Sequence, residues 1–460
     1  MCGIIATISK ENNFYDLYEG LYHLQHRGQD SFGISYLNNS NIETIKYNKI
    51  LADIDIDNSI EFNIGIGHVR YPTTGDITIN ECQPFYLENE FHNISIIHNG
   101  QITITKKLIQ FFKDNNIKLE NNITSDSIYL LHLLSFYLNE HILLNSEILT
   151  QIIKNIQNLL EGSYNCICII NTTGLICFKD KQSIRPLIYG KKNNKYIISS
   201  ESISLTSLDY NIINDIYGNE LLFFDLNNKL HKIQLNQISQ KNILKPCLFE
   251  WVYLAREEST IYNVNVYKSR IKMGEFLANT IRNNIVTKEL LEIDSIIPVP
   301  DTSKPIALSI SKELNIPYYE AITKNRYVKR TFIMNNQLNR KKNIKRKLNT
   351  IKHLIENKNL LIVDDSIVRG NTFKHIINLL RENNAKKIYF VSSSPPIINK
   401  NIFGIDIPDK KQLLMANTTI KTIEKELDIK LIFQNIEDLK RSINIFNNKL
   451  TDFEESIFNS

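Results

Sequence analysis

The sequence predicts an α+β or layered domain in the first half of the chain and an α/β domain with a parallel sheet in the second. Before about residue 240, short runs rich in β-branched residues recur between turn signals. After Pro246, buried apolar strands alternate with amphipathic helices, which is typical of a parallel sheet covered on both faces. This change of pattern places a domain boundary near residues 240 to 250.

In the first half, each predicted strand is a short apolar or alternating run bounded by polar turn residues. The runs cover residues 2–9, 33–37, 63–69, 94–100, 165–178, 195–202 and 220–226. Two stretches, residues 126–141 and 147–162, instead have the apolar spacing of helices.

In the second half, helical patterns cover residues 268–285, 304–314 and 372–383, and buried strands cover residues 295–300, 359–365 and 386–394. Residues 419–446 again alternate helix and strand signals, and we expect them to pack onto the second domain.

Composition and charge exclude several classes of protein. A length of 460 residues allows two or three domains at roughly 150 residues each, and 42% hydrophobic residues exclude a disordered or fibrous chain. A formal charge of +5 is too small for a chain that wraps nucleic acid. No apolar run reaches the roughly 18 residues of a membrane span, and the N-terminus lacks a signal-peptide pattern. We therefore expect a soluble, cytoplasmic protein with neither nucleic-acid nor membrane partners.

Six cysteines are too few for a disulfide framework, and five of them lie in apolar or strand-like stretches where a reduced, buried thiol is expected. Cys2 differs because removal of Met1 would give it a free α-amine. Such an amine, with a pKa of about 7.7 to 8.0, can accept the thiol proton. Cys2 would then carry nucleophile and base in one residue, and Gly3 lets a substrate approach closely.

Polar residues at predicted strand ends could serve such a nucleophile. Asn99 and Gly100 follow a strand and can supply the donors of an oxyanion hole. Arg70 is expected on a loop at a sheet edge, where it could bind a carboxylate. Asp126 precedes an apolar helix and could be only a cap or first-turn acid. Taken singly, each of these residues is more often structural than catalytic.

Together, MCGI at residues 1–4, LQHRGQDSFGI at 24–34, GHVRYPTTG at 67–75, HNGQI at 98–102 and TSDS at 124–127 resemble the motifs of N-terminal-nucleophile glutamine amidotransferases. The resemblance implies a layered αββα amidohydrolase domain in which Cys2 attacks the glutamine amide. It further implies that Asn99 and Gly100 hold the oxyanion and that the glutamine-binding residues are Arg27, Arg70 and Asp126.

A second group of residues points to a phosphorylated sugar. The apolar strand Leu360–Val363 runs into Asp364 and Asp365, which suit a ribose diol and a hydrated divalent cation. The Ser/Gly/Thr-rich turn that follows opens a helix and can bind a phosphate. The whole unit resembles the phosphoribosyl-pyrophosphate loop of type I phosphoribosyltransferases.

Motifs across nearly the whole chain resemble the amidophosphoribosyltransferase family. They are CLFEWVYLAR at 247–256, IIPVPDTS at 296–303, KNRYVKRTFIM at 324–334, RKLNT at 346–350, VDDSIVRGNT at 363–372 and FGID at 403–406. The resemblance implies conversion of phosphoribosyl pyrophosphate (PRPP), glutamine and water to 5-phosphoribosylamine, pyrophosphate and glutamate, the first step of de novo purine biosynthesis. It implies a glutaminase domain at 1–245, a phosphoribosyltransferase domain at 246–445 and a shortened tail at 446–460.

By the same resemblance, one Mg²⁺ per subunit binds at Thr302, Asp364 and Asp365, with Ser303 as the alternative to Thr302. The PRPP-binding residues are Asp364, Asp365, Ser366, Ile367, Val368, Arg369, Gly370, Asn371, Thr372, Lys304 and Lys347. Lys347 belongs to the basic segment from about 323 to 347, which would close over PRPP, although alone that segment would be a solvated face. Tyr253 matches a residue that couples the two sites.

The chain also departs from part of the family. No cysteine follows Cys247, so four ligands for an iron–sulfur cluster are lacking, and only Met1 precedes the nucleophile. We therefore expect the cluster-free, propeptide-free type. Purine nucleotides are expected as feedback inhibitors and a homodimer or homotetramer as the assembly.

Two other functions remain open from the sequence. A regulatory phosphoribosyltransferase homologue could bind PRPP without catalysis, but it would not need Cys2 and its surrounding residues. Another glutamine amidotransferase of the same class would need a different synthase domain in place of VDDSIVRGNT.

Overall fold

The computed structural model describes residues 2–54, 59–71, 78–119, 123–235, 244–325, 348–407 and 409–458. The molecule divides into two compact units. Unit 1 contains Met1–Cys247 together with two short later segments, Thr260–Tyr262 and Ile402–Asp406. Unit 2 contains Leu248–Ser259, Asn263–Asn401 and Ile407–Ser460.

Unit 1 contains two antiparallel sheets. The seven-stranded sheet has the order β11 (Asn211–Asp215), β9 (Ile188–Lys192), β10 (Lys195–Ser199), β1 (Gly3–Ile8), β4 (Ile64–Arg70), β2 (Ser31–Asn38) and β3 (Asn41–Tyr47). The six-stranded sheet has the order β13 (Leu230–Gln234), β12 (Glu220–Asp225), β8 (Gly174–Lys179), β7 (Glu161–Ile170), β6 (Ile94–Thr103) and β5 (Phe85–Leu87).

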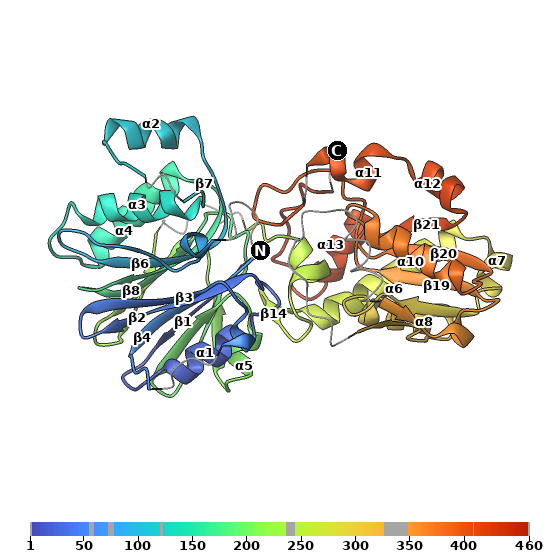
Figure 1. Ribbon diagram of the computed structural model, residues 1–460, viewed down its shortest axis with the longest axis horizontal. Helices are drawn as coiled ribbons and strands as arrows, with labels where there is room; N and C mark the ends of the chain where they lie inside the picture. The colour runs from blue at the N-terminus through green and yellow to red at the C-terminus, as the bar shows by residue number, and fades with distance from the viewer. Residues whose placement is uncertain are drawn as a thin grey trace. The chain divides into compact units, whose positions relative to one another are not determined.

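The two sheets pack face to face, and helices cover their outer faces (Figure 1). Along β1, Ile4 and Ala6 join the core between the sheets, whereas Ile5 faces α1 (Phe14–Tyr22) and α5 (Ile203–Thr206). On the other side, α3 (Ser127–Leu138) and α4 (Ser146–Leu159) cover the six-stranded sheet. Because successive side chains point to opposite faces of a strand, each sheet packs against the other sheet on one face and against helices on the other. This arrangement gives the predicted αββα layers.

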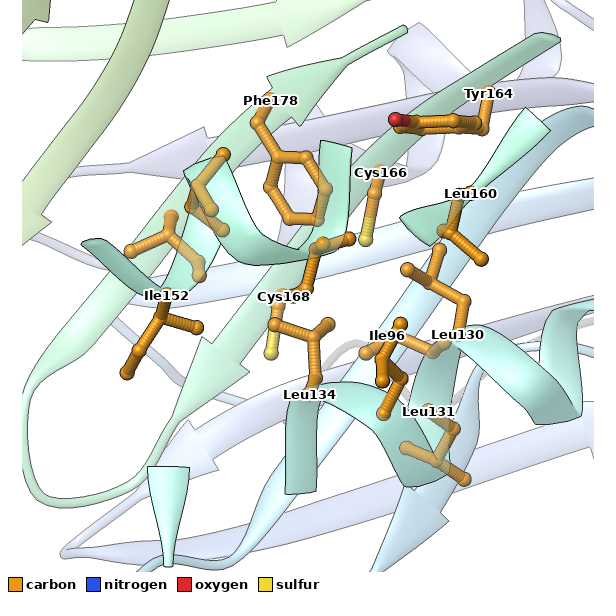
Figure 2. Close-up of a cluster of buried hydrophobic side chains, with 14 of the residues drawn as sticks. Ile96, Leu130, Leu131, Leu134, Ile152, Leu160, Tyr164, Cys166, Cys168 and Phe178 are labelled. Atoms are coloured by element: carbon orange, nitrogen blue, oxygen red, sulfur yellow. The ribbon is translucent and has the colours of Figure 1, made fainter. Parts of the chain in front are cut away.

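Figure 2 shows the core beneath α3 and α4, where Cys166 and Cys168 on β7 point among leucine, isoleucine and phenylalanine side chains. Burial raises the pKa of both thiols, so they stay protonated. All five cysteines other than Cys2 are buried and free of disulfides, as the sequence predicts.

Sequence periodicity missed the short or exposed elements of unit 1, namely α1, α2 (Lys106–Asp114), α5, β3, β5, β9, β11 and β13. It also extended one helix too far, because α4 ends at Leu159 and β7 begins at Glu161.

Unit 2 is built on a parallel sheet of order β16 (Ser295–Pro298), β19 (Asn359–Asp364), β20 (Lys387–Ser392) and β21 (Lys430–Phe433). Helices α6 (Val266–Asn284) and α8 (Lys304–Leu314) pack on one face, and α10 (Asn371–Glu382) and α12 (Ile420–Leu427) pack on the other. Alternate residues of β19 pack into the cores on the two faces of the sheet. Because both faces are buried, the strand is a continuous apolar run.

Smaller elements complete unit 2. They are the short strand β15 (Val264–Asn265), the pair β17 (Ile322–Lys324) and β18 (Leu348–Thr350), and helices α7 (Thr287–Leu291), α11 (Leu414–Asn417) and α13 (Ile436–Asn444). The short strand β14 (Thr260–Ile261) belongs to unit 1. Residues after 445 pack into this unit through Leu450, Phe453 and Ile457. In the described part of the chain, no helix is both long and apolar enough to cross a bilayer.

Candidate active sites

Cys2 lies immediately before β1 in unit 1 and is half-buried. Antiparallel pairing of Gly3 with Val69 brings Cys2 to the end of β4, where its Sγ lies 3.7 Å from the carbonyl oxygen of Tyr71. A Cβ on Gly3 would come within 2.9 Å of both Leu24 and Val69. Glycine at this position therefore allows the chain next to the nucleophile to pack closely against these two side chains.

Asn99 and Gly100 lie on β6, opposite Asn165 and Tyr164 of β7. Asn99 is fully buried, yet neither its side-chain oxygen nor its nitrogen has a hydrogen-bond partner among the described residues. Gly100 has a φ of +151°, and a Cβ there would collide with the carbonyl oxygen of Ser163. β6 continues to Thr103, so the two residues lie within the strand rather than after it, where the sequence predicted them. A buried amide without partners is costly unless a ligand satisfies it, so this part of β6 fits an oxyanion hole.

Arg70 is the last residue of β4, so it lies at a strand end rather than on the loop that the sequence predicted. Its guanidinium is buried, and Nη2 lies 3.9 Å from Oε2 of Glu81. The other oxygen of Glu81 accepts hydrogen bonds from Thr124, at 2.5 Å from the backbone nitrogen and 2.9 Å from the hydroxyl. Glu81 thus holds Arg70 and the segment before Asp126 together.

Asp126 occupies the N-cap position of α3, but its side chain makes no capping hydrogen bond. Instead Oδ2 accepts a hydrogen bond of 2.6 Å from the backbone nitrogen of Ile102 on β6. The carboxylate is therefore fixed to the strand that carries Asn99 and Gly100.

Arg27 is buried, and its Nε donates to the buried carboxylate of Glu201. The same oxygen of Glu201 lies 2.7 Å from Nε2 of His26. Sequence reasoning missed Glu201 and Glu81. The single available signal was an acid inside an otherwise apolar or uncharged stretch, as Glu201 is in YIISSES at residues 196–202.

Two buried histidines lie in the same region of unit 1. Burial lowers the pKa of His68 on β4 and of His98 on β6, so both imidazoles are neutral near pH 7. The Nδ1 of His98 lies 2.8 Å from the hydroxyl of Ser127, next to Asp126. Neither histidine therefore adds a positive charge to the glutamine site.

In unit 2, Asp364 ends β19 and Asp365 follows it. The backbone nitrogen of Asp365 donates to Oδ1 of Asp364 at 2.9 Å, and the hydroxyl of Ser366 donates to Oδ1 of Asp365 at 2.8 Å. Burial raises the pKa of both carboxyls, and the charge of Asp365 raises that of Asp364 further. Such a pair favours binding of a cation that compensates both charges.

Residues 366–370 form the loop after the acids, and Asn371 and Thr372 begin α10. Gly370 at its N-cap has a φ of +77°, and a Cβ there would lie 2.8 Å from Leu414. Ile367 is buried, so only its backbone is available to a bound phosphate. Arg369 is exposed, and its Nε donates to Oε1 of Gln412 at 3.2 Å. The helix N-terminus and the turn provide the backbone N–H groups that a phosphate needs.

The loop after β16 is positioned by the parallel pairing of Pro298 with Val363. It therefore leaves the sheet at the same edge as Asp364. The hydroxyl of Ser303 is buried and donates to the carbonyl oxygen of Val299 at 2.6 Å, whereas Thr302 is half-buried. Lys304 points to acids, with Nζ 2.8 Å from Glu320 and 4.0 Å from Asp301.

Tyr253 lies in a π-helical turn, Glu250–Leu254, and is 39% exposed. The buried guanidinium of Arg270 on α6 fixes this turn through the carbonyl oxygens of Trp251 at 3.0 Å and Ala255 at 2.9 Å. Lys347 and most of the predicted closing segment, residues 326–347, lie outside the described residues. Within the described ranges, no three His, Cys, Asp or Glu side chains gather as a metal cluster would require.

Comparisons with known proteins identify both halves of the chain. A glutamine amidotransferase domain model matches residues 69–207, and a phosphoribosyl transferase domain model matches residues 266–394. Curated amidophosphoribosyltransferases of Pasteurella multocida and Escherichia coli are 37% and 36% identical to the chain. Each alignment covers 100% of this chain and 92% of the relative.

Two solved structures are similar over the whole chain. One is the glutamine PRPP amidotransferase of B. subtilis in complex with ADP and GMP, with a TM-score of 0.85, 26% identity, and coverage of 100% of this chain and 96% of that one. The other is described as the allosteric regulatory enzyme of purine biosynthesis, with a TM-score of 0.86, 25% identity, and coverage of 100% and 95%. The chain therefore belongs to the amidophosphoribosyltransferase family.

Proposed function

We propose that unit 1 hydrolyses glutamine at Cys2 and that unit 2 uses the ammonia to convert PRPP to 5-phosphoribosylamine and pyrophosphate. The observation that supports this proposal most directly is the side-chain amide of Asn99, which is buried beside Gly100. Neither its oxygen nor its nitrogen has a hydrogen-bond partner among the described residues. A free α-amine on Cys2 accepts the thiol proton, and the thiolate attacks the glutamine carboxamide. Asn99 and Gly100 stabilise the oxyanion, ammonia leaves, and water hydrolyses the thioester.

Arg70 and Asp126 hold the α-carboxylate and the α-ammonium of glutamine, and Arg27 orders the site. The decisive test is Cys2→Ala, which should abolish glutamine-dependent synthesis and keep ammonia-dependent synthesis. Equal loss of both activities would refute the separation of the two sites. Intact-mass measurement of the active protein should show Cys2 at its N-terminus.

In unit 2, Asp364 and Asp365 bind the ribose diol, and residues 366–372 bind the 5′-phosphate. The acid pair and Thr302 suit one Mg²⁺ per subunit, which would neutralise pyrophosphate as it leaves. The hydroxyl of Ser303 is already used by Val299, which supports Thr302 as the third ligand. Asp365→Asn should weaken use of PRPP with either nitrogen source, and an unchanged rate would remove this acid from the site.

Lys304 and Lys347 complete the PRPP site in this proposal. Lys304 now pairs with Glu320, so binding of the pyrophosphate would exchange that carboxylate for a phosphate oxygen. Lys304→Ala should therefore raise the KM for PRPP with glutamine and with ammonia alike. Tyr253 couples the two reactions, and Tyr253→Ala should lower the yield of amine per glutamine hydrolysed.

We further propose that the enzyme is of the cluster-free type. No cysteine follows Cys247, and Cys166, Cys168 and Cys177 are core thiols of unit 1 whose pKa values burial raises. Purified enzyme should contain no iron and retain activity in air.

Regulation and assembly are also proposals. The B. subtilis structure holds ADP and GMP, which supports inhibition by purine nucleotides here. We expect a homodimer or homotetramer, which light scattering would identify. Titration of the purified enzyme with ADP and GMP, singly and together, tests the inhibition.

A further inference from the structure

The backbone of Gly404 packs directly on the part of β6 that carries the proposed oxyanion hole, and the preceding residue, Phe403, is bound by Ser163 on β7. Phe403 and Gly404 belong to unit 1, although Phe403 lies 240 residues after Ser163 in the chain. Gly404 has a φ of +94°, and a Cβ there would lie 2.8 Å from the carbonyl carbon and oxygen of Gly100. The backbone of Gly404 is therefore in close contact with the Gly100 peptide.

The carbonyl oxygen of Phe403 is held by two buried side chains of unit 1. The hydroxyl of Ser163 on β7 donates to it at 2.7 Å. Arg185, whose side chain is fully buried, donates from Nε at 2.9 Å and also from Nη2. Hydrogen bonds from a buried cation are stronger than those between neutral groups, so the segment is fixed firmly in place.

Gly100 is restricted on a second side as well. Its backbone lies so close to the carbonyl of Ser163 that a side chain would not fit between them, and Ser163 is the residue that also holds Phe403. The position of the Gly100 backbone therefore depends on both β7 and the Phe403–Gly404 segment. An oxyanion donor loses most of its effect when it moves from its position, because the interaction depends on distance and direction.

We propose that Phe403 and Gly404, held by Ser163 and Arg185, position Gly100 for oxyanion stabilisation during glutamine hydrolysis. This inference rests on the proposed role of Gly100 and gives a function to the FGID motif at residues 403–406. Phe403 and Gly404 are positioning residues, because they act through Gly100 rather than by contact with glutamine.

The test is Gly404→Ala in the full-length enzyme, with Gly174→Ala as the matched control. Gly174, the first residue of β8, also has a positive φ, +127°, and lies close to a backbone carbonyl, that of Phe224 on β12; it pairs with Ile170 at the far end of β7. For Gly404→Ala we expect the kcat of glutamine hydrolysis to fall about 10- to 100-fold, with KM for glutamine within about 3-fold. Ammonia-dependent synthesis should stay near the wild-type rate.

A second measurement separates positioning from damage to the nucleophile. Alkylation of Cys2 by iodoacetamide forms no oxyanion, so its rate, followed by peptide mapping, should be unchanged in Gly404→Ala. Ser163→Ala removes one donor to Phe403 and should lower kcat about 3- to 10-fold. Ser95→Ala on β6 removes a buried hydroxyl that contacts Ser35 on β2 of the other sheet at 2.9 Å, and should leave kcat unchanged.

Three outcomes would overturn the inference. They are a wild-type kcat in Gly404→Ala, an equal loss in Gly174→Ala, or a rise in KM without a fall in kcat. Asn99→Ala distinguishes these from failure of the proposed function. A large loss of kcat in Asn99→Ala with no loss in Gly404→Ala would reject the positioning role and keep the oxyanion hole.

Discussion

Asp126 accepts a hydrogen bond of 2.6 Å from the backbone nitrogen of Ile102, so one carboxylate oxygen fixes the start of α3 to β6. Ile102 lies two residues after Gly100 on the same strand. The residue proposed to bind the α-ammonium of glutamine is therefore held in register with the oxyanion hole. This arrangement lets us separate the charge of Asp126 from its structural role.

Asp126→Asn keeps an oxygen for the Ile102 hydrogen bond but removes the negative charge. We expect the KM for glutamine to rise about 10- to 100-fold with a smaller change in kcat, because the ammonium loses its ion pair. Ammonia-dependent synthesis should be unaffected. Asp126→Ala loses the hydrogen bond as well, so its melting temperature should fall below that of Asp126→Asn. Equal KM values for glutamine in Asp126→Asn and the wild type would show that Asp126 does not bind the α-ammonium.

Glu81→Gln tests the acid that links Arg70 with Thr124. The neutral amide can still accept from Thr124, but it no longer attracts the guanidinium of Arg70, 3.9 Å away. We expect the KM for glutamine to rise about 3- to 10-fold because Arg70 loses its orientation. Exposed Glu90→Gln is the control. If Glu81→Gln had the same KM for glutamine as Glu90→Gln, Arg70 would be positioned by other contacts.

The sequence predicted the elements whose pattern is strongly periodic. β1, β6 and β19 are continuous or alternating apolar runs, and Asp364 lies at the end of β19, as its position in the sequence predicted. Asn99 was expected just after a strand but lies inside β6, which continues to Thr103. The short edge strands were missed because exposed residues leave no period to detect.

The supporting residues could not be predicted because their partners come from distant segments. Glu81 and Glu201 acquire their roles only when the fold brings Arg70 and Arg27 to them. Nothing local in the stretch from Ile402 to Asp406 indicates that its backbone packs on Gly100, 300 or so residues earlier. Asp126 is a related case, since its place at a helix start suggested a cap that its side chain does not form.

The raised pKa of Asp364 predicts a pH-dependent stability. A carboxyl that binds its proton more tightly in the folded state makes the fold less stable as pH rises above the ordinary carboxyl pKa of about 4. Without a divalent cation, the melting temperature should therefore fall between pH 5 and pH 8. Asp364→Asn removes a buried charge and should melt a few degrees higher than wild type at pH 8, while losing synthesis with glutamine and with ammonia.

The control for this prediction is Asp114→Asn, which changes an exposed acid on α2 and should leave the pH profile as it is. Millimolar Mg²⁺ with PRPP should stabilise the wild type at pH 8 and have little effect on Asp364→Asn. A steeper fall of melting temperature with pH in Asp364→Asn than in the wild type would contradict the assignment.

The last prediction concerns Tyr262, which belongs to unit 1 although it follows Cys247 in the chain. Its hydroxyl lies 3.0 Å from Nζ of Lys179 and donates to the carbonyl oxygen of Ser183 at 2.9 Å. Lys179 is fully buried, and burial lowers its pKa to about 8, so it depends on these few partners. Tyr262→Phe should lower the free energy of unfolding, measured in urea, by about 1–3 kcal/mol. A chain that ends at Cys247 lacks Tyr262, so it should fail to form an active glutaminase. Exposed Tyr267→Phe is the matched control, and an equally stable Tyr262→Phe enzyme would show that water replaces the hydroxyl.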